Sequence, residues 1–421
     1  MNSQKLLLSV IFLLPFVAFT NAQPAFAKGG DLSWLPQMEA TGYKFYNDSG
    51  IQEDCFKILK DHGFNTIRLR TFVNPSADKT NGHCSKDETV AMAVRAQSWG
   101  MRIMIDFHYS DTWADPGHQA KPAAWVGHDF PTLLNDLYNY TFDVMTALKT
   151  AGVSPEWVQV GNETSGGMVY PEGSNASSWS QLIQLMNKGY DAIKAVSPTS
   201  KVILHIDGGH DNGRFRWWFD NAKANGAKYD VIGLSYYPYW ITGSPDYSLS
   251  INALGNNLLD MVTRYGKQVM VVEVGGVDTQ AQNTYDMLVA VQNKVNAVPN
   301  NNGLGVLYWE PEGARSWSGY ALSAWGSDGK PTLALNAFNL QTAVEKTQNQ
   351  DLSIKWNKDS NSFVFNEEAS NIKMVDLNAK TIFQSTNCSK ISGEGINKGI
   401  YLVTACQKST NTVYNLKTIK F

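Results

Sequence analysis

Short apolar runs alternate with longer amphipathic segments along most of the chain. The runs are rich in Val, Ile and Leu, which is typical of parallel strands buried on both faces, and the segments between them have the length and period of helices. Eight strand and helix units in succession predict an α/β fold, a closed (β/α)8 TIM barrel, over residues 28–342. The eight runs are Asp31 to Leu35, Thr66 to Phe72, Arg102 to Tyr109, Trp157 to Glu163, Lys201 to Asp207, Val231 to Pro238, Gln268 to Gly276 and Gly303 to Pro311.

Some of the helical segments have recognisable ends. A helix is predicted from Pro131 to Lys149, because proline favours the first turn, and similar helices are predicted over Ser178 to Val196 and Gln280 to Val295. An open, doubly wound sheet would usually carry a glycine-rich phosphate turn after its first strand, and Asp31 to Leu35 leads into no such turn. The barrel is therefore the favoured architecture.

The pattern changes near the C-terminal end of this region. Residues 343–352 are polar and predict a linker. Residues 353–421 contain short alternating runs separated by Asn, Gly, Ser and Lys, which predict a small, β-sandwich-like module. The expected strands are Ser362 to Phe365, Lys373 to Leu377, Thr381 to Gln384, Ile400 to Thr404 and Val413 to Phe421.

The N-terminus has the pattern of a secretory signal peptide over residues 1–22. Lys5 supplies a basic start, Leu6 to Phe19 an apolar core, and Thr20 to Ala22 a small-residue exit. The apolar core is shorter than the roughly 20 residues that a membrane-spanning helix needs. We therefore expect export of a soluble mature protein.

Charge and cysteine content narrow the function classes. The formal net charge is −3, so we expect no nucleic-acid partner and no attraction to an anionic membrane. No HxxxH or CxxC spacing marks a transition-metal site, and we expect no metal and no cofactor. The cysteines fall in two pairs that are compatible with two local disulfides or with free buried thiols: Cys55 and Cys84, and Cys388 and Cys406.

Two glutamates, Glu163 and Glu273, each end an apolar run. In a parallel barrel the C-terminal strand ends meet at one mouth, where barrel enzymes carry their chemistry. Two carboxyl groups at one mouth are what glycosidic bond cleavage needs. A single carboxylate after a strand is more often a helix cap or ion-pair partner, but the other strand ends are also polar and shift the balance toward catalysis. They supply Arg68, Arg70, Asp106, His108, Tyr109, Asn162, His205, Asp207, Tyr236, Tyr237, Tyr308, Trp309, Glu310 and Glu312.

The two carboxyl groups would need different surroundings. Arg68 and Arg70 alternate onto one strand face, and an arginine beside a carboxylate keeps it ionised as a nucleophile. An apolar wall or a second negative charge keeps the other protonated as a general acid. Flat aromatic rings suit the C–H faces of sugars. The candidate sugar platforms are Trp113, Trp125, Trp240, Trp309, Trp317 and Trp325.

Five motifs carry a family likeness. They are FYNDSG at Phe45 to Gly50, IDFHYSDTWADPGHQ at Ile105 to Gln119, VQVGNE at Val158 to Glu163, LSYYP at Leu234 to Pro238 and YWEPE at Tyr308 to Glu312. Together the motifs resemble glycoside hydrolase family 53, the arabinogalactan endo-β-1,4-galactanases. The resemblance implies a secreted, retaining hydrolase of β-1,4-galactan in pectin, which we expect to be a monomer.

The resemblance also implies roles for individual residues. Glu163 would be the general acid/base and Glu273 the nucleophile. Asn162 would hold the substrate 2-hydroxyl, and Arg70 and Tyr237 would orient the nucleophile. The sugar subsites would be lined by His108, Trp113, His205, Asp207 and Trp309.

Two features depart from the family pattern. Some bacterial members bind calcium through a long acidic loop after strand seven, whereas Val274 to Thr284 is short and mostly uncharged. After strand five the family commonly has an Asp-Asn-Gly-like turn, and this chain has Asp207-Gly208-Gly209. We expect no calcium site and an altered subsite contact at the second position.

The C-terminal tail resembles the sorting domain of type IX secretion at Val375 to Ile382, Ile396 to Val403 and Lys417 to Lys420. This likeness implies the type IX machinery as a partner and release or attachment at the cell surface. A stabilising or glycan-binding β module is the alternative. For the barrel, the alternatives are a retaining hydrolase of mannan or xylan and a non-catalytic glycan-binding protein.

Overall fold

The chain divides after Asn339 into two compact units. The computed structural model describes residues 25–243, 246–339, 352–376, 380–408 and 412–420. The predicted signal segment 1–22 and almost all of the predicted linker 343–352 lie outside the described residues. Among the residues described, no helix is both long and apolar enough to span a membrane.

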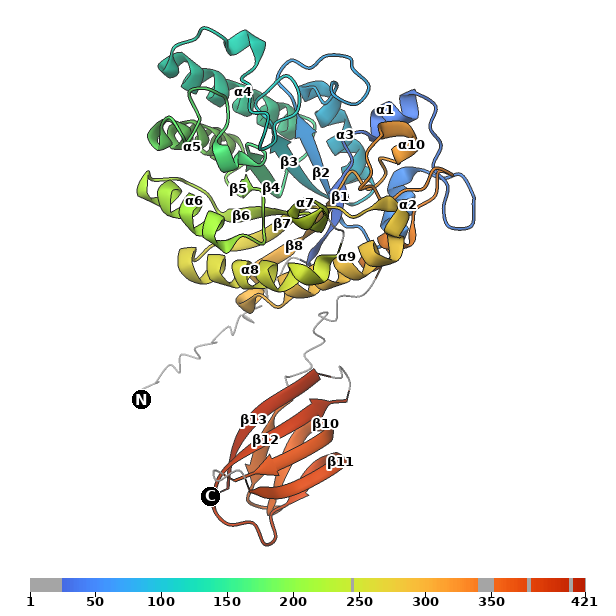
Figure 1. Ribbon diagram of the computed structural model, residues 1–421, viewed down its shortest axis with the longest axis vertical. Helices are drawn as coiled ribbons and strands as arrows, with labels where there is room; N and C mark the ends of the chain where they lie inside the picture. Colours follow the sequence, from blue (N-terminus) through green and yellow to red (C-terminus); the bar gives the residue numbers. More distant parts are fainter. Residues whose placement is uncertain (1–24, 244–245, 340–351, 377–379, 409–411, 421) are drawn as a thin grey trace, which may run out of the picture. The chain divides into compact units, whose positions relative to one another are not determined.

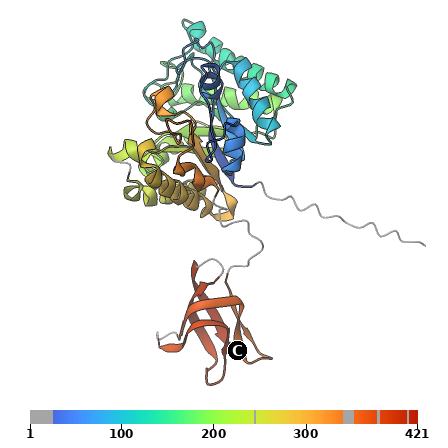
Figure 2. The ribbon, with the colours of Figure 1, turned by 90° about the vertical axis from the view of Figure 1, so that its right-hand side faces the viewer.

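The first unit is a closed barrel of eight parallel strands with the helices on its outside (Figures 1 and 2). Each strand pairs with its neighbours in chain order, and β8 closes the ring on β1. The barrel predicted from the alternating pattern is therefore confirmed. The strands are β1 Ala27–Asp31, β2 Thr66–Thr71, β3 Arg102–Phe107, β4 Trp157–Val160, β5 Lys201–Ile206, β6 Val231–Tyr236, β7 Gln268–Val274 and β8 Gly303–Trp309.

The predicted first strand, Asp31 to Leu35, is wrong because β1 lies four residues earlier. β1 has the sequence AKGGD and lacks the large apolar side chains of a buried strand. Its neighbours are too close for side chains: a Cβ on Gly29 would lie 1.8 Å from the Thr66 carbonyl oxygen. Leu35 of the expected run is buried instead at the start of α1.

The helices begin and end near the residues that favour helix termini in the sequence. The three helices predicted with bounds are confirmed within two residues as α4, α5 and α9. At α3, Ser85 and Glu88 form a capping box. The helices are α1 Leu35–Ala40, α2 Cys55–Asp61, α3 Lys86–Ser98, α4 Phe130–Thr150, α5 Trp179–Val196, α6 Asn212–Ala224, α7 Pro238–Thr242, α8 Ile251–Tyr265, α9 Ala281–Asn296 and α10 Arg315–Ser318.

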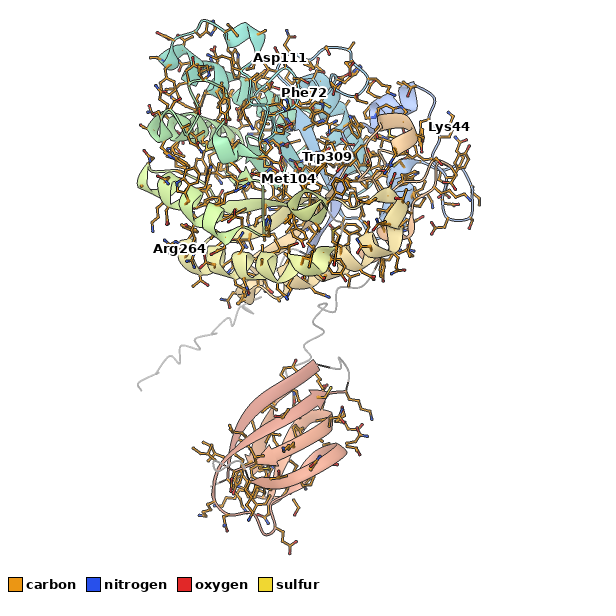
Figure 3. The ribbon with its side chains drawn as sticks, in the orientation of Figure 1. Lys44, Phe72, Met104, Asp111, Arg264 and Trp309 are labelled. Atoms are coloured by element: carbon orange, nitrogen blue, oxygen red, sulfur yellow. The ribbon has the colours of Figure 1, made fainter. Side chains whose placement is uncertain are left out.

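The barrel interior is apolar at one end and polar at the other. Met104, labelled in Figure 3, and Trp157 belong to an apolar cluster inside the ring that also takes residues from β1 and β5 to β8. A larger apolar cluster fills the space between strands and helices. Because the lower interior is packed with apolar side chains, the charged strand residues gather near the C-terminal strand ends.

The second unit is an antiparallel sheet, which confirms an all-β module. Its five strands pair in one sheet, in the order β11-β10-β12-β13 with β9 on β10, rather than in two facing sheets. The predicted strand at 362–365 and the described part of the one at 373–377 belong to a single strand, β10; residue 377 lies outside the described residues. Two register shifts let β10 continue through the turn-like residues between them. The strands are β9 Ile354–Asn357, β10 Ser362–Val375, β11 Thr381–Ser392, β12 Gly399–Gln407 and β13 Thr412–Lys420.

The structure contains neither of the two local disulfides that the sequence left open. Cys55 and Cys84 are buried free thiols. Cys388 on β11 pairs with Ala369, and Cys406 on β12 lies beside Ser370, so β10 runs between the two cysteines. Two strand spacings amount to about 9.5 Å, which exceeds the Cα separation of about 4.4–6.8 Å that a disulfide spans.

Candidate active site

A cleft of about 640 Å³ opens at the C-terminal ends of the barrel strands. Its walls include both strand-end glutamates, Glu163 and Glu273, so the structure brings together the two carboxyl groups that the sequence singles out. The wall also contains predicted binding residues and residues that the sequence did not indicate. The main lining residues are Trp113, Asp115, Asn162, Asp207, Arg214, Ser235, Tyr237, Trp240, Trp309 and Tyr320.

Glu273, on β7, is held between a cation and a phenol. Its Oε1 forms an ion pair of 2.8 Å with Nη2 of Arg68, and its Oε2 accepts a hydrogen bond of 3.2 Å from the hydroxyl of Tyr237. Burial raises the pKa of Glu273 to about 7, although Arg68 and Tyr237 both oppose the increase. These two partners favour the ionised carboxylate, which is the form that a nucleophile needs.

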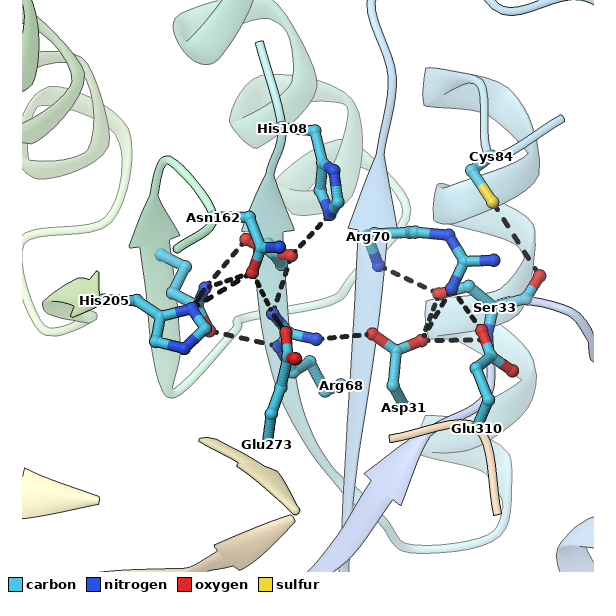
Figure 4. A network of polar contacts seen from close by, with 12 residues as sticks. Asp31, Ser33, Arg68, Arg70, Cys84, His108, Asn162, His205, Glu273 and Glu310 are labelled. Carbon is cyan, nitrogen blue, oxygen red and sulfur yellow. Dashed lines mark hydrogen bonds and ion pairs between the residues drawn. The ribbon is translucent and has the colours of Figure 1, made fainter. Parts of the chain in front are cut away.

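Arg68 is the centre of a buried polar network beneath the cleft (Figure 4). Its Nη1 donates to Asp31 at 2.9 Å, and its Nη2 donates to Asp106 and Asn162, each at 2.8 Å. Its Nε donates to Gln159 at 3.1 Å. A buried guanidinium with this many partners has little freedom to move, so it fixes the position of the charge that faces Glu273.

Glu163 lies two residues beyond the glycine that follows β4, in a different environment. Its backbone adopts the left-handed conformation with φ 45°, which turns the chain sharply at the barrel mouth. Burial and the charge of Glu273 raise the pKa of Glu163 well above its usual value, while a hydrogen bond from Ser235 lowers it. Burial and the neighbouring negative charge therefore favour the protonated form of the Glu163 carboxyl group.

His205, on β5, supports Glu163 from below. Its Nε2 lies 2.7 Å from Oγ of Ser235, and its Nδ1 accepts a bond of 3.3 Å from the backbone N–H of Glu163. Burial lowers the pKa of His205 well below its usual value, so the ring is neutral. Nδ1 is then the acceptor, and Nε2–H donates to Ser235, whose own hydroxyl proton faces Glu163.

Three predicted substrate residues do not reach the cleft. Arg70 is 1% exposed, His108 2% and His205 0%, and none of them lines the cavity. That His108 and His205 line the sugar subsites stays a prediction; in this structure both rings lie below the surface of the cleft. The reason is the pleat, which points these alternate side chains into the barrel interior, below the residues that form the cleft surface.

Arg70 was predicted to orient the nucleophile, whereas the arginine that pairs with Glu273 in this structure is Arg68. Arg70 is bonded to Glu310 and, at 3.3 Å, to Asp31. Its guanidinium carbon lies 4.2 Å from the ring centroid of Trp113. Arg70 therefore supports a wall of the cleft by a cation–π contact rather than contacting Glu273.

Aromatic rings form one wall of the cleft. Trp309 packs edge-on against Trp113 at 5.5 Å and against Tyr320 at 4.7 Å. Trp240, on α7, is 67% exposed. Three of the six tryptophans that the sequence offered as sugar platforms line the cleft, namely Trp113, Trp240 and Trp309. The other three, Trp125, Trp317 and Trp325, pack elsewhere.

Sequence reasoning located Asp207 but missed its partners. Asp207 is bonded to the hydroxyl of Ser165 and forms an ion pair of 2.6 Å with Arg214. Arg214 and Tyr320 come from a helix and from the segment after β8, where no strand-end pattern could indicate them. Ser235 is two residues before Tyr237 in the predicted strand, so both side chains are expected on the same face. This spacing could have indicated Ser235 as a residue of the cleft.

Within the described residues, no group of three or more His, Cys, Asp or Glu side chains is arranged to hold a metal ion.

Comparison with known families identifies the barrel. The model of glycosyl hydrolase family 53 matches residues 27–370, which covers the whole ring of strands and continues into β10. The chain belongs to glycosyl hydrolase family 53. It is a glycoside hydrolase, and the cleft lies at the C-terminal face of the barrel, where barrel enzymes carry their active sites.

Relatives in the family have galactanase names. An arabinogalactan endo-beta-1,4-galactanase of Thermothelomyces thermophilus is 33% identical over 307 residues, which cover 68% of this chain and 89% of the relative. An endo-beta-1,4-galactanase of Bacillus subtilis is 32% identical over 311 residues, covering 68% of this chain and 70% of the relative.

Solved structures agree with this assignment. A fungal beta-1,4-galactanase superposes with a TM-score of 0.68 at 30% identity, over 75% of this chain and all of that chain. The family 53 catalytic domain of Ignisphaera aggregans gives a TM-score of 0.69 at 26% identity, over 76% of this chain and 97% of the other.

Proposed function

We propose that this family 53 enzyme is a retaining endo-β-1,4-galactanase that cleaves galactan side chains of pectin. The observation that carries the proposal is the contrast between Glu163 and Glu273 within one cleft: only Glu273 faces an arginine. The galactanase names of relatives that align over two thirds of the chain support the substrate class.

The first half of the reaction forms a covalent intermediate. The carboxylate of Glu273 attacks the anomeric carbon of the sugar, and the bond between that carbon and the glycosidic oxygen breaks. Glu163 gives its proton to the departing oxygen, so the shortened chain leaves as an alcohol. Arg68 and Tyr237 hold Glu273 in position before the attack.

The second half returns the enzyme to its starting state. Glu163, now ionised, takes a proton from a water molecule, whose oxygen attacks the anomeric carbon and displaces Glu273. Two inversions at one carbon give net retention. Ionised Glu163 keeps a hydrogen-bond donor in Ser235, which favours this base form.

Asn162 is placed to recognise the sugar beside the reacting carbon. Its Oδ1 accepts a bond from Arg68 at 2.8 Å, and its Nδ2 donates to the Ala114 carbonyl oxygen at 2.7 Å. These bonds fix the orientation of the amide. The amide nitrogen has a second N–H, which is available for the substrate 2-hydroxyl.

A polysaccharide panel tests the proposal. Purified protein is incubated with linear β-1,4-galactan, mannan, xylan and cellulose, and reducing ends, product sizes and the configuration of the first products are followed. We expect short oligosaccharides with the β configuration from galactan alone. Cleavage of mannan or xylan in its place would overturn the substrate, and products of the α configuration would overturn the retaining mechanism.

The proposal extends to location. The signal-like pattern at residues 1–22 and the motifs of the C-terminal sheet support export through the type IX machinery, with the enzyme, as a monomer, released or attached at the cell surface; residues 377–379 of those motifs lie outside the described residues. Mass spectrometry of the culture fluid and cell surface of the native host tests this: protein confined to the cytoplasm would contradict it.

A further inference from the structure

A second groove adjoins the catalytic cleft. It encloses about 930 Å³ and shares Trp113 and Asp115 with the cleft wall. Its other walls come from the segment after β3, which includes Ala120 and Val126, and from Tyr170 in the segment after β4. The two spaces are therefore neighbours across a ridge made of Trp113 and Asp115.

The ridge between the two spaces is rigidly held. The indole N–H of Trp113 donates to Oδ1 of Asn81 at 3.0 Å, while Arg70 lies against the ring at 4.2 Å. Asp115 exchanges backbone hydrogen bonds of 2.9 and 3.0 Å with His118. A ring fixed in this way is prepared to contact a ligand without first losing conformational freedom.

The floor of the groove is tied to the catalytic segment. Gln119 is 3% exposed, and its Nε2 donates to the backbone carbonyl of Asn162 at 2.8 Å. The backbone N–H of Tyr170 donates to the Gln119 carbonyl at 2.7 Å. The wall with Tyr170 is thus joined, through one buried glutamine, to the residue beside Glu163.

The chemistry of the groove suits an uncharged ligand. The ammonium group of Lys121 is paired with Glu172 at 2.6 Å, and His118 is paired with Asp115 at 2.9 Å. Between these pairs the surface is apolar and includes Val126, which is 66% exposed. Apolar and aromatic faces beside polar groups match the C–H faces and hydroxyls of a neutral sugar.

We propose that the groove holds distal units of the same β-1,4-linked galactan chain that is cut in the cleft. The chain crosses the ridge at Trp113, and units on the far side rest against Tyr170 and Val126. This inference rests on the proposed function, because it takes the occupant of the cleft to be galactan. Its direct consequence is that long substrates gain binding energy that short ones cannot reach.

The test measures kcat/KM on β-1,4-galacto-oligosaccharides of increasing length and on the linear polymer. Tyr170→Ala removes an aromatic wall of the groove. Ala120→Arg places a large side chain in the groove. Because Ala120 is exposed, the substitution creates no cavity in the core. A matched control, Phe142→Ala, removes an aromatic side chain that is 40% exposed on α4, outside both spaces.

We expect both groove variants to match the wild type on the shortest cleaved oligosaccharides and to lose about ten-fold in kcat/KM on the polymer, mostly through KM. Phe142→Ala should match the wild type at every length. Equal activity of Ala120→Arg and wild type at every length would overturn the inference while leaving the proposed function intact.

Two other results separate neighbouring explanations. A loss confined to arabinose-branched galactan would overturn the inference, because the occupant would then be a branch rather than the main chain. Absence of galactan hydrolysis by the wild type would be a failure of the proposed function itself.

Discussion

Glu163 and Glu273 differ less in burial than in their nearest partners. Arg68 and the hydroxyl of Tyr237 contact Glu273, and both lower its pKa against the effect of burial. Burial and the charge of Glu273 raise the pKa of Glu163, and the hydroxyl of Ser235 opposes them. As the pH rises, Glu273 therefore ionises first while Glu163 stays protonated. These are the states that glycoside cleavage needs in its nucleophile and its general acid.

Tyr237→Phe tests the support of the nucleophile. Removing one hydroxyl deletes the bond of 3.2 Å to Glu273, and a hydrogen bond to a charged group is worth about 1.5–3 kcal/mol. We expect kcat/KM to fall by about ten-fold to a hundred-fold. In the wild type this bond lowers the pKa of Glu273, which is about 7. Its loss should therefore raise that pKa and move the acidic limb of the pH profile to higher pH.

The neighbouring Tyr236 provides the control for this variant. Its hydroxyl is bonded to Ser250 at 2.8 Å, outside the cleft. Tyr236→Phe should leave the acidic limb in place. An unmoved acidic limb in Tyr237→Phe would mean that the phenol does not act on the nucleophile.

Ser235→Ala tests the support of the acid. The Ser235 hydroxyl lowers the pKa of Glu163, so its loss should raise that pKa and move the basic limb of the kcat/KM profile to higher pH. The acidic limb should stay within a few tenths of a pH unit, roughly, of the wild type. A shift of the acidic limb alone would show that Ser235 serves Glu273 instead.

At the scale of elements, the strands with strong side-chain patterns were predictable. Seven barrel runs begin at the residues where the strands begin, because each fills both faces with Val, Ile, Leu or aromatic side chains. β1 was missed, since close approach to Thr66 of β2 excludes side chains at its glycines. Within β10, Asn366 and Asn371 look like turn residues, yet pairing with strands on both sides carries the strand through them.

The site was predictable only in part for a related reason. Strand-end position marked Glu163 and Glu273, because it depends on the period of the chain alone. Arg68 and Arg70 lie on the same face of β2 at different depths in the barrel. The depth decides which of them pairs with Glu273, and the sequence pattern does not give it. Arg214 reaches the cleft from α6 and Tyr320 from the segment after β8, where sequence spacing carries no such information.

The short segment after Glu163 is held by a helix on the outside of the barrel. The indole N–H of buried Trp218, on α6, donates to the Thr164 carbonyl at 3.0 Å, and the Thr164 hydroxyl donates to the His205 carbonyl at 3.0 Å. These two bonds stabilise the left-handed turn at Glu163, a conformation that costs a non-glycine residue about 1–2 kcal/mol.

Trp218→Phe should therefore weaken both stability and catalysis. We expect a loss of about 1–3 kcal/mol in the free energy of unfolding, because a buried hydrogen bond is lost and the Thr164 carbonyl keeps only the N–H of Gly167 as a donor among the contacts described. We also expect a lower kcat with little change in KM. Denaturant unfolding and steady-state kinetics measure the two effects. Trp217→Phe, at a neighbouring position that is 50% exposed, is the control and should change neither quantity; a Trp218→Phe enzyme with wild-type kcat would contradict the positioning role.

For the whole molecule, buried carboxyl groups set the dependence of stability on pH. Glu310 and Glu312 are both 0% exposed, and the charge of Glu310 acts on Glu312. Burial raises the pKa of Glu310 to about 7, against Arg70, and raises that of Glu312 well above its usual value. A carboxyl group whose pKa is higher in the folded protein than in the unfolded chain contributes its full stabilisation at pH values below the unfolded-state pKa. This contribution is lost as the pH rises toward 7 and beyond.

Glu312→Gln tests this dependence. The amide has a similar size but cannot ionise, so the variant should be more stable than the wild type by about 2 kcal/mol above pH 7 and about equal below pH 5. Thermal unfolding across this range measures the difference. If stability depends on pH in the same way in both proteins, Glu312 does not contribute to this dependence through a raised pKa.

The division into two units predicts where activity resides. Every residue that lines the cleft lies between Trp113 and Tyr320, within the first unit, which ends at Asn339. A protein ending at Asn339 should keep kcat/KM on galactan within about two-fold of the full chain. A large loss, with the barrel still folded by circular dichroism, would give the C-terminal sheet a part in catalysis.

The most direct test of the central claim is the initial rate of galactan hydrolysis by wild type, Glu163→Gln and Glu273→Gln at equal concentration. Each substitution keeps the size of the side chain and removes its proton transfer or its nucleophile. We expect each variant to lose about a hundred-fold or more in kcat. If either variant retains activity within about ten-fold of the wild type, that glutamate does not carry the chemistry assigned to it.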